Sequence, residues 1–310
     1  MFYSKSDLPR WGRSTFNDGG EDEISLIGIP VTLMYVKSVE NTEFVPDTLG
    51  EVPQTVYKFR SWADLYHRKI FTDKELWFAH PFTLNDHEDL RQPSKVVIDR
   101  LLSYDAYRHW WDYVSQIYPD ATRKFKKTML DVKFREIQAD PVGYFQKGLW
   151  VTQANADDYD IFGVLSLTDK VLEDEVWERY GDKHKGFCIG FSTNELSRDM
   201  MGLYGKVVYS DSLLDYDPLK EYSGQEIASG FFKKTTAWKN ESEYRFLTAR
   251  IESQTDRAKK FSDESVAEVI LGCDISDDHE KEIVSAVREN FNKEIPILRC
   301  RRRLEMEALK

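Results

Sequence analysis

The residues best suited to chemistry stand in one short stretch, TTAWKNESEYRFL, which covers residues 235–247. Two glutamates, Glu241 and Glu243, are separated by one residue and followed by Arg245. If a strand begins at about Asn240, side chains two residues apart lie on one face, about 6.8 Å from one another. The spacing therefore predicts an anionic strand face with a guanidinium beside it.

Two interpretations of this glutamate pair stay open. In the first, the stretch is a solvated edge strand: Tyr244 and Phe246 face the core, and Arg245 pairs with Glu243. In the second, one glutamate holds a substrate hydroxyl or stabilises a developing positive charge, as carboxylates do in glycosyl transfer. The spacing of the two glutamates alone does not decide between them.

A second acidic group stands in the loop NDHED, which contains Asn85, Asp86 and Asp89. Such side chains after a strand often cap the backbone of a turn or the start of a helix. Alternatively, Asp86 and Asp89 bind a hard divalent ion together with Glu243.

Three further positions have a local interpretation. Arg60 follows an aromatic strand and either binds phosphate or pairs with a carboxylate. Gly186, after His184, allows a close backbone approach or a positive φ before a strand. Cys188 is expected to be a small buried side chain rather than a nucleophile.

Composition narrows the classes of protein to which the chain can belong. The 310 residues are 41% hydrophobic, which is enough to bury a core. A net charge of -11 does not indicate nucleic-acid binding, although a local basic groove stays possible. The sequence has three widely spaced cysteines, a start that does not resemble a leader peptide and no long apolar run. We therefore expect a cytoplasmic protein without membrane contact.

The pattern of elements predicts an α+β fold with a mixed, mainly antiparallel sheet. We expect an added N-terminal element over residues 1–50 and a main domain over residues 51–310. Helical periodicity predicts an insertion at about residues 94–150. The last segments, VAEVILGCDI, DDHEKEIVSAVRENF and IPILRCR, predict a C-terminal β-α-β element.

Seven sequence blocks follow one another in a characteristic order between Val56 and Gly272. They are VYKFRSW, LWFAHPFTLNDHED, GVLSLT, VWERYGDKHKGFCIGF, VVYSD, FFKKTTAWKNESEYRF and VAEVILG. This series resembles the bacterial domain-of-unknown-function family DUF2971. His87 stands where that family usually has proline.

The family pattern falls on residues spread over the whole series. They are Tyr57, Lys58, Arg60, Asn85, Asp86, Asp89, Trp177, Tyr180, Gly186, Phe187, Lys233, Trp238, Glu241, Glu243, Tyr244 and Arg245. The resemblance also implies an association with anti-phage or mobile-element genes.

The order of Arg60, the strand before Pro81 and the glutamate pair is similar in layout to ADP-ribosyltransferases. That likeness implies NAD as substrate, Arg60 on its pyrophosphate, Glu243 on the ribose next to nicotinamide, and Glu241 orienting the acceptor. Aromatic rings at Tyr57, Trp238 or Tyr244 could stack on the bases. The remaining candidates around the cofactor are Lys58, Asn85 and Asp86.

The leading expectation is thus an ADP-ribosyltransferase-like enzyme of bacterial conflict that modifies a macromolecular acceptor. A metal-dependent nuclease using Asp86, Asp89 and Glu243 is the first alternative. The second is a non-catalytic module that senses a phage or host protein through the helical region.

Overall fold

A computed structural model describes most of the chain. The described residues are 47–49, 51–86, 89–90, 94–141, 160–212, 214–217, 219–220, 229–248, 251–301 and 306–308. The N-terminal element expected over residues 1–50 lies outside them apart from 47–49, so the division into residues 1–50 and 51–310 stays a prediction. His87 also lies outside the described residues.

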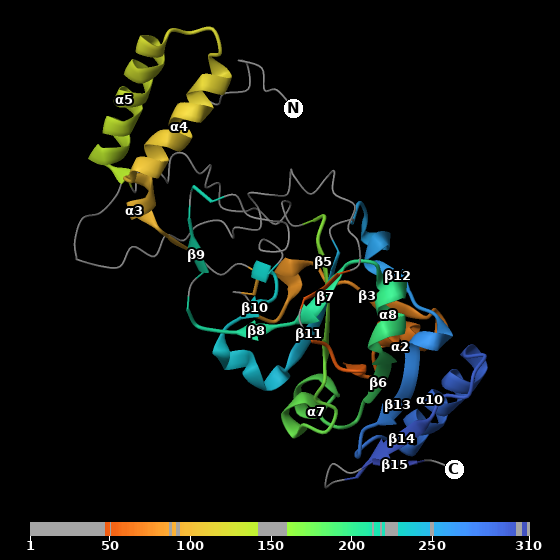
Figure 1. Ribbon diagram of the computed structural model, residues 1–310. Helices are drawn as coiled ribbons and strands as arrows, with labels where there is room; N and C mark the ends of the chain where they lie inside the picture. The colour runs from red at the N-terminus through yellow and green to blue at the C-terminus, as the bar shows by residue number, and fades with distance from the viewer. Residues whose placement is uncertain are drawn as a thin grey trace.

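A nine-stranded mixed sheet forms the centre of the described structure (Figure 1). Across the sheet the strands are β1 (Asp47–Leu49), β7 (Leu203–Lys206), β11 (Glu243–Thr248), β5 (Gly163–Thr168), β2 (Thr55–Arg60), β6 (Phe187–Ser192), β13 (Val266–Leu271), β14 (Ile297–Cys300) and β15 (Met306–Ala308). Neighbours are antiparallel except β1 with β7 and β13 with β14. The predicted α+β class with a mainly antiparallel sheet is confirmed.

Alternating side chains place the two faces of this sheet against different helices. In β6, Phe187, Ile189 and Phe191 join the larger core, while Cys188 points to a smaller core on the other face. The larger core is covered by α2 (Leu65–Thr72), α8 (Thr193–Met200) and α10 (Asp277–Asn290), and the smaller one by α7 (Asp174–Tyr180). Cys188 is fully buried, as its sequence context predicts.

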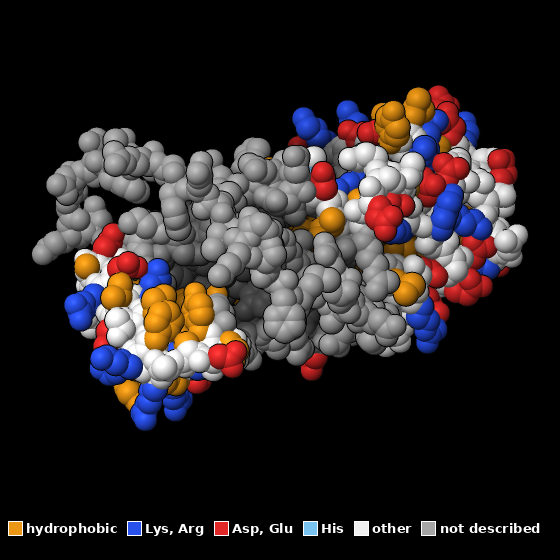
Figure 2. Space-filling view, turned by 90° about the horizontal axis from the view of Figure 1, so that it is seen from above, with side chains coloured by type: hydrophobic (Ala, Val, Ile, Leu, Met, Phe, Trp, Pro, Cys, Tyr) orange, Lys and Arg blue, Asp and Glu red, His pale blue; other side chains and the backbone are white. Residues whose placement is uncertain are grey.

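The predicted helical insertion is present, and it extends away from the sheet (Figure 1). It comprises β4 (Ser94–Val96), α3 (Ile98–Leu101), α4 (Tyr104–Ile117) and α5 (Arg123–Ala139). Ser103 and Thr122 cap α4 and α5, and Tyr107 packs edge-on against Phe134 between them. Figure 2 shows hydrophobic side chains gathered on this helical pair, with Lys and Arg around them.

The C-terminal part forms the predicted β-α-β element. The parallel strands β13 and β14 are joined by α10, whose first turn is capped by Ser276 and carries three acidic residues. The smaller elements are β3 (Glu75–Trp77), η2 (Pro81–Thr83), β8 (Val208–Tyr209), β9 (Leu214–Tyr216), β10 (Lys233–Lys234), η4 (Thr236–Glu241), η5 (Gln254–Arg257), β12 (Ala258–Lys260) and η6 (Asp263–Ser265). Within the described part of the chain, no helix combines the length and apolar character that crossing a bilayer requires.

Gly186 directly precedes β6, where the chain passes very close to the end of β2. A Cβ atom at this position would lie 2.2 Å from the backbone oxygen of Arg60 and 2.9 Å from that of Gly181. Both obstacles are backbone atoms, which cannot swing aside as a side chain can. The close approach expected from the sequence is therefore present, and it fixes the end of β2 that carries Arg60.

We predict that Gly186→Ala destabilises the protein by about 1–3 kcal/mol, because the added methyl group forces β2 and β6 apart. Urea unfolding followed by circular dichroism measures the loss. The control is Leu65→Ala, since Leu65 is 71% exposed and its removal leaves the core intact. Equal stabilities of Gly186→Ala and the wild type would show that the strands can separate at no cost.

Candidate functional site

A cavity of about 270 Å³ lies where two central strands diverge. β2 and β5 pair only at Tyr57 and Thr168, whereas β2 pairs with β6 over six residues and β5 with β11 over six. Beyond that single pair, the segment at Ala79 bridges to Val164 on β5 and closes the far end of the gap. The sheet is thus open between β2 and β5, and the cavity occupies the opening.

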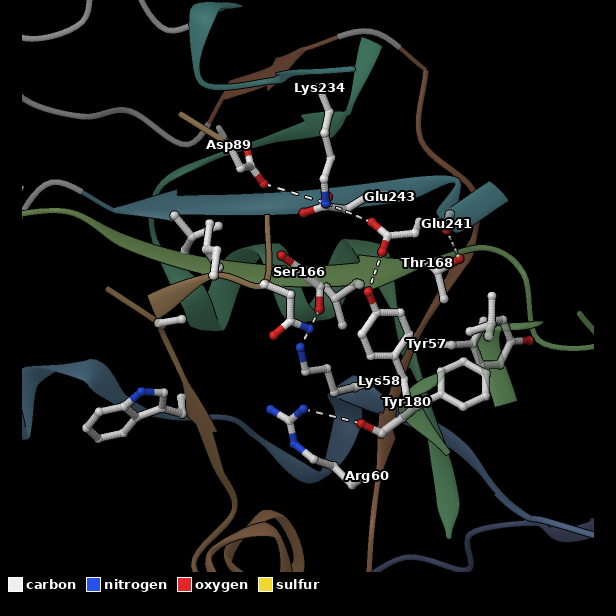
Figure 3. Close-up of a pocket in the computed structure, with 18 of the residues that line it drawn as sticks. Tyr57, Lys58, Arg60, Asp89, Ser166, Thr168, Tyr180, Lys234, Glu241 and Glu243 are labelled. Carbon is white, nitrogen blue, oxygen red and sulfur yellow. Dashed lines mark hydrogen bonds and ion pairs between the residues drawn. The ribbon is translucent and has the colours of Figure 1, made fainter. Parts of the chain in front are cut away.

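Side chains from both diverging strands, from α7, from β10, η4 and β11, and from the segment 77–89 line the cavity (Figure 3). The polar ones are Tyr57, Lys58, Arg60, Thr83, Asn85, Asp89, Ser166, Thr168, Tyr180, Lys234, Glu241 and Glu243. Residues more than 150 positions apart in the sequence therefore converge on one space.

One side of the cavity is cationic. Lys58 donates to the backbone oxygen of Ser166 at 2.5 Å, and Arg60 donates to that of Phe59 at 3.3 Å (Figure 3). Burial, together with the charge of Arg60, lowers the pKa of Lys58 well below its ordinary value. Burial likewise lowers the pKa of Arg60 to about 10. Among the described residues neither cation has a carboxylate within ion-pair distance.

The two glutamates are on the opposite side, and the chain bends between them. Glu241 ends η4, Ser242 has a left-handed φ of 41°, and Glu243 begins β11. The Thr168 hydroxyl donates to the backbone oxygen of Glu241 at 2.6 Å, and the backbone N–H of Glu243 donates to the Tyr209 hydroxyl at 2.8 Å. These bonds hold both sides of the bend.

This bend corrects two sequence-based expectations. The strand does not begin at about Asn240, and Glu241 does not share a strand face with Glu243, because the left-handed residue between them changes the direction of the chain. The edge-strand interpretation is also wrong, since β11 lies between β7 and β5 and every residue of it is buried. The pairing of Arg245 with Glu243, which that interpretation included, is present.

A fully buried arginine organises the acidic side. Arg245 donates two hydrogen bonds to Asp89, at 3.0 and 2.9 Å, and two to Glu243, at 2.9 and 2.8 Å. Its Nη1 also donates to the backbone oxygen of Phe231 at 2.8 Å. Burial alone would raise the pKa of Glu243, but the charge and hydrogen bonds of Arg245, with help from Lys234 and Ser166, hold it to about 2.

Lys234 connects this ion cluster to Glu241. Its Nζ lies 2.8 Å from Glu241, 3.3 Å from Glu243 and 3.6 Å from Asp89 (Figure 3). Burial would lower the pKa of Lys234, but the charges of these carboxylates outweigh it and raise the pKa. The Tyr180 hydroxyl donates to the other oxygen of Glu241, which fixes the carboxylate on both sides.

The structure brings most of the predicted site residues together. Glu241, Glu243, Arg60, Tyr57, Lys58 and Asn85 line the cavity. Asp86, Trp238 and Tyr244 do not line it. Asp86 is buried, and the centre of the Trp238 ring lies 4.7 Å from the Lys234 Nζ. Tyr244 lines another hollow together with Lys206.

Sequence reasoning missed the residue that links the cluster. The family pattern falls on Lys233, but the cavity contains Lys234, whereas Lys233 donates to the backbone oxygen of Ser212. The block FFKKTT offered two adjacent lysines and no signal to choose between them. Ser166 and Thr168 were also missed, although GVLSLT places two hydroxyl groups on one strand face.

The alternative metal site receives no support from this geometry. Asp89 and Glu243 both form ion pairs with the Arg245 guanidinium. The carboxylate oxygens that a metal ion would need as ligands are therefore already bound to a cationic side chain. Across the residues described, no group of three or more His, Cys, Asp or Glu side chains is placed to hold a metal ion.

The fold and site thus define an α+β protein with a charged cavity in a split central sheet. Residues 176–246, less than half of the chain, match the model of a family described as "Protein of unknown function (DUF2971)". This match confirms the family that the ordered sequence blocks predicted. No curated protein and no solved structure matches the chain, and the layout similarity to ADP-ribosyltransferases is not confirmed.

The matched segment covers one side of the cavity only. It runs from α7 to β11 and contains Tyr180, Lys234, Glu241, Glu243 and Arg245. The strand β2, with Lys58 and Arg60, lies outside it.

We predict that Arg245→Met lowers the free energy of unfolding by about 3–5 kcal/mol, because it leaves Asp89 and Glu243 buried without their cation. Chemical denaturation measures the change. In the triple variant that adds Asp89→Asn and Glu243→Gln, part of the stability should return, since the unpaired charges are removed. A single variant as stable as the wild type would refute the central role of the buried cluster.

A second prediction concerns the dependence of the unfolding free energy on pH. The folded-state pKa of Glu243, about 2, is below its ordinary value of 4.5, so its ionised form contributes stability that is complete above pH 4.5. That contribution is lost as the pH falls toward 2. The difference in unfolding free energy between the wild type and Glu243→Gln should therefore shrink over this range. A difference that stays constant between pH 4.5 and 2 would contradict the prediction.

Proposed function

We propose that the cavity binds NAD and that the protein is an ADP-ribosyltransferase-like enzyme, which cleaves the bond between nicotinamide and ribose and modifies a macromolecular acceptor. The observation that carries this proposal is the polarity of the cavity. Lys58 and Arg60 face it with no carboxylate of the described residues within ion-pair distance, and Glu241 and Glu243 face it from the other side.

The cationic side suits the phosphates of such a ligand. A planar guanidinium such as that of Arg60 can donate two parallel hydrogen bonds to a phosphate. Lys58 has a lowered pKa, and a bound phosphate would favour its protonated form. These two side chains come from one strand face, so they would contact neighbouring phosphates of one pyrophosphate group.

The acidic side suits the reacting ribose. When the bond between C1′ and the pyridinium nitrogen breaks, its electron pair stays on that nitrogen, and neutral nicotinamide leaves. Positive charge then develops on C1′ and the ring oxygen of the ribose. A fixed carboxylate near these atoms stabilises the charge, and a nucleophile of the acceptor completes the transfer by bonding to C1′ and losing its proton.

The geometry favours Glu241 over Glu243 for this carboxylate. Arg245, Lys234 and Ser166 occupy the acceptor sites of the Glu243 carboxylate. Among the described residues, the Glu241 carboxylate accepts hydrogen bonds from the Tyr180 hydroxyl and Lys234 only, and it forms a 3.5 Å ion pair with the half-exposed Arg179. Glu241 therefore keeps acceptor capacity for a ribose hydroxyl, and Glu243 serves to position Lys234.

The order of the strands agrees with this proposal. β2 with Arg60, β5 with Ser166 and Thr168, and β11 with Glu243 are neighbours in the sheet. A hydroxyl-bearing strand thus stands between the arginine strand and the glutamates. The role in bacterial conflict, and with it a phage or host trigger, comes from the family resemblance and remains part of the proposal.

We predict that the wild type releases nicotinamide from NAD and that Glu241→Gln reduces kcat by about 100-fold or more. The amide keeps the shape of the side chain but loses the negative charge that stabilises the ribose cation. Nicotinamide is measured by chromatography in the presence of a bacterial lysate as a source of acceptors and triggers.

Glu178→Gln is the matched control, because Glu178 is an exposed glutamate on α7, the helix that carries Tyr180. This variant should retain full activity. NAD that stays intact with the wild type in every lysate, including lysates of phage-infected cells, would refute the proposed function. Equal rates for Glu241→Gln and the wild type would refute the role of Glu241.

A further inference from the structure

A second hollow, of about 420 Å³, lies next to the cavity in the split sheet. It is formed by α2 on one side and by the two-stranded ribbon of β3 and β12 on the other. Tyr66 and His67 line it from the helix, and Trp77 lines it from the ribbon. This hollow has no part in the carboxylate chemistry proposed above.

The two spaces share walls. Arg60 and Trp77 line both the hollow and the cavity, so the Arg60 guanidinium stands between them. The only side-chain hydrogen bond that Arg60 makes among the described residues is the 3.3 Å bond to the backbone oxygen of its neighbour Phe59. A ligand that extends from one space into the other would therefore pass a guanidinium whose donors are mostly unused.

Two aromatic rings of the hollow are available for stacking. Trp77 is 48% exposed and Tyr66 is 79% exposed. Neither ring packs against another aromatic ring in the described part of the chain. A flat apolar face in contact with water gains most from a flat aromatic ligand, such as a nucleobase.

The charges of the hollow agree with a phosphate-bearing ligand. Lys69 adds a cation to its wall. Among the described residues that line it, Glu75 is the one acidic side chain, and it is paired with Lys260 at 3.0 Å. The described lining of the hollow therefore presents no unpaired carboxylate to repel a phosphate. It combines aromatic faces with positive charge, which is the chemistry that nucleotides require.

We propose that this hollow binds the adenosine end of a dinucleotide, with the base stacked on Trp77 and Tyr66 and the pyrophosphate on Arg60. The inference rests on the proposed function in one respect, since it makes the dinucleotide NAD. The nicotinamide half would then occupy the cavity in the split sheet, next to Glu241. Together the two spaces account for both halves of the ligand.

Calorimetric titration of the full-length protein with ADP and with nicotinamide mononucleotide tests the assignment. Tyr66→Ala and Trp77→Ala should each weaken ADP binding by about tenfold, because each removes one stacking face. Tyr66→Ala should leave the binding of nicotinamide mononucleotide unchanged, since Tyr66 lines only the hollow. Leu65→Ala is the matched control: Leu65 is exposed on the same helix but does not line the hollow, so ADP affinity should not change.

The outcomes separate this inference from the proposed function. If both aromatic variants weaken ADP binding but the protein never cleaves NAD, the nucleotide site is supported and the proposed enzyme activity is refuted. If the protein cleaves NAD but neither Tyr66→Ala nor Trp77→Ala changes its affinity for ADP, the proposed enzyme activity stands and the adenosine site is refuted. Absence of ADP binding by the wild type overturns the site as well.

Discussion

The arrangement of the site depends on one buried guanidinium. Arg245 is fully buried and holds Asp89, which is 156 residues away in the sequence, against Glu243 on its own strand. Removing an arginine and two carboxylates from water is costly unless their hydrogen bonds are complete. The loop that carries Asp89 must therefore dock on β11, and this docking places Leu84 and Asn85 in the wall of the cavity.

The ion cluster also determines the charge that the cavity presents. Lys234 and Arg245, both buried, hold the carboxylates of Asp89, Glu241 and Glu243, and Glu241 also forms a 3.5 Å ion pair with the half-exposed Arg179. These carboxylates form the acidic wall of the cavity. The opposite wall carries Lys58 and Arg60, which form no ion pair with a carboxylate in the part of the chain that the structure describes. A ligand with phosphates at one end and a developing positive charge at the other matches this polarity, whereas a uniformly charged ligand would be repelled at one wall.

Local patterns predicted the elements but not the opening between them. Helical periodicity located α4 and α5, and the ordered sequence blocks included Lys58 and Arg60, which lie two residues apart on β2. The divergence of β2 from β5 depends on contacts between distant segments, such as the bridge from Ala79 to Val164, which no local pattern contains. The choice of Lys234 over Lys233 likewise depends on which way a two-residue strand faces.

The glutamate pair shows why spacing alone could not assign roles. Two glutamates separated by one residue are equivalent only if the chain between them is extended, and Ser242 adopts a left-handed conformation instead. Glu243 then belongs to the sheet, where Arg245 binds both of its oxygen atoms. Glu241 belongs to the preceding turn, where Tyr180 and Lys234 hold it at the cavity wall. One backbone angle thus separates a carboxylate that stabilises the fold from one that is free to meet a ligand.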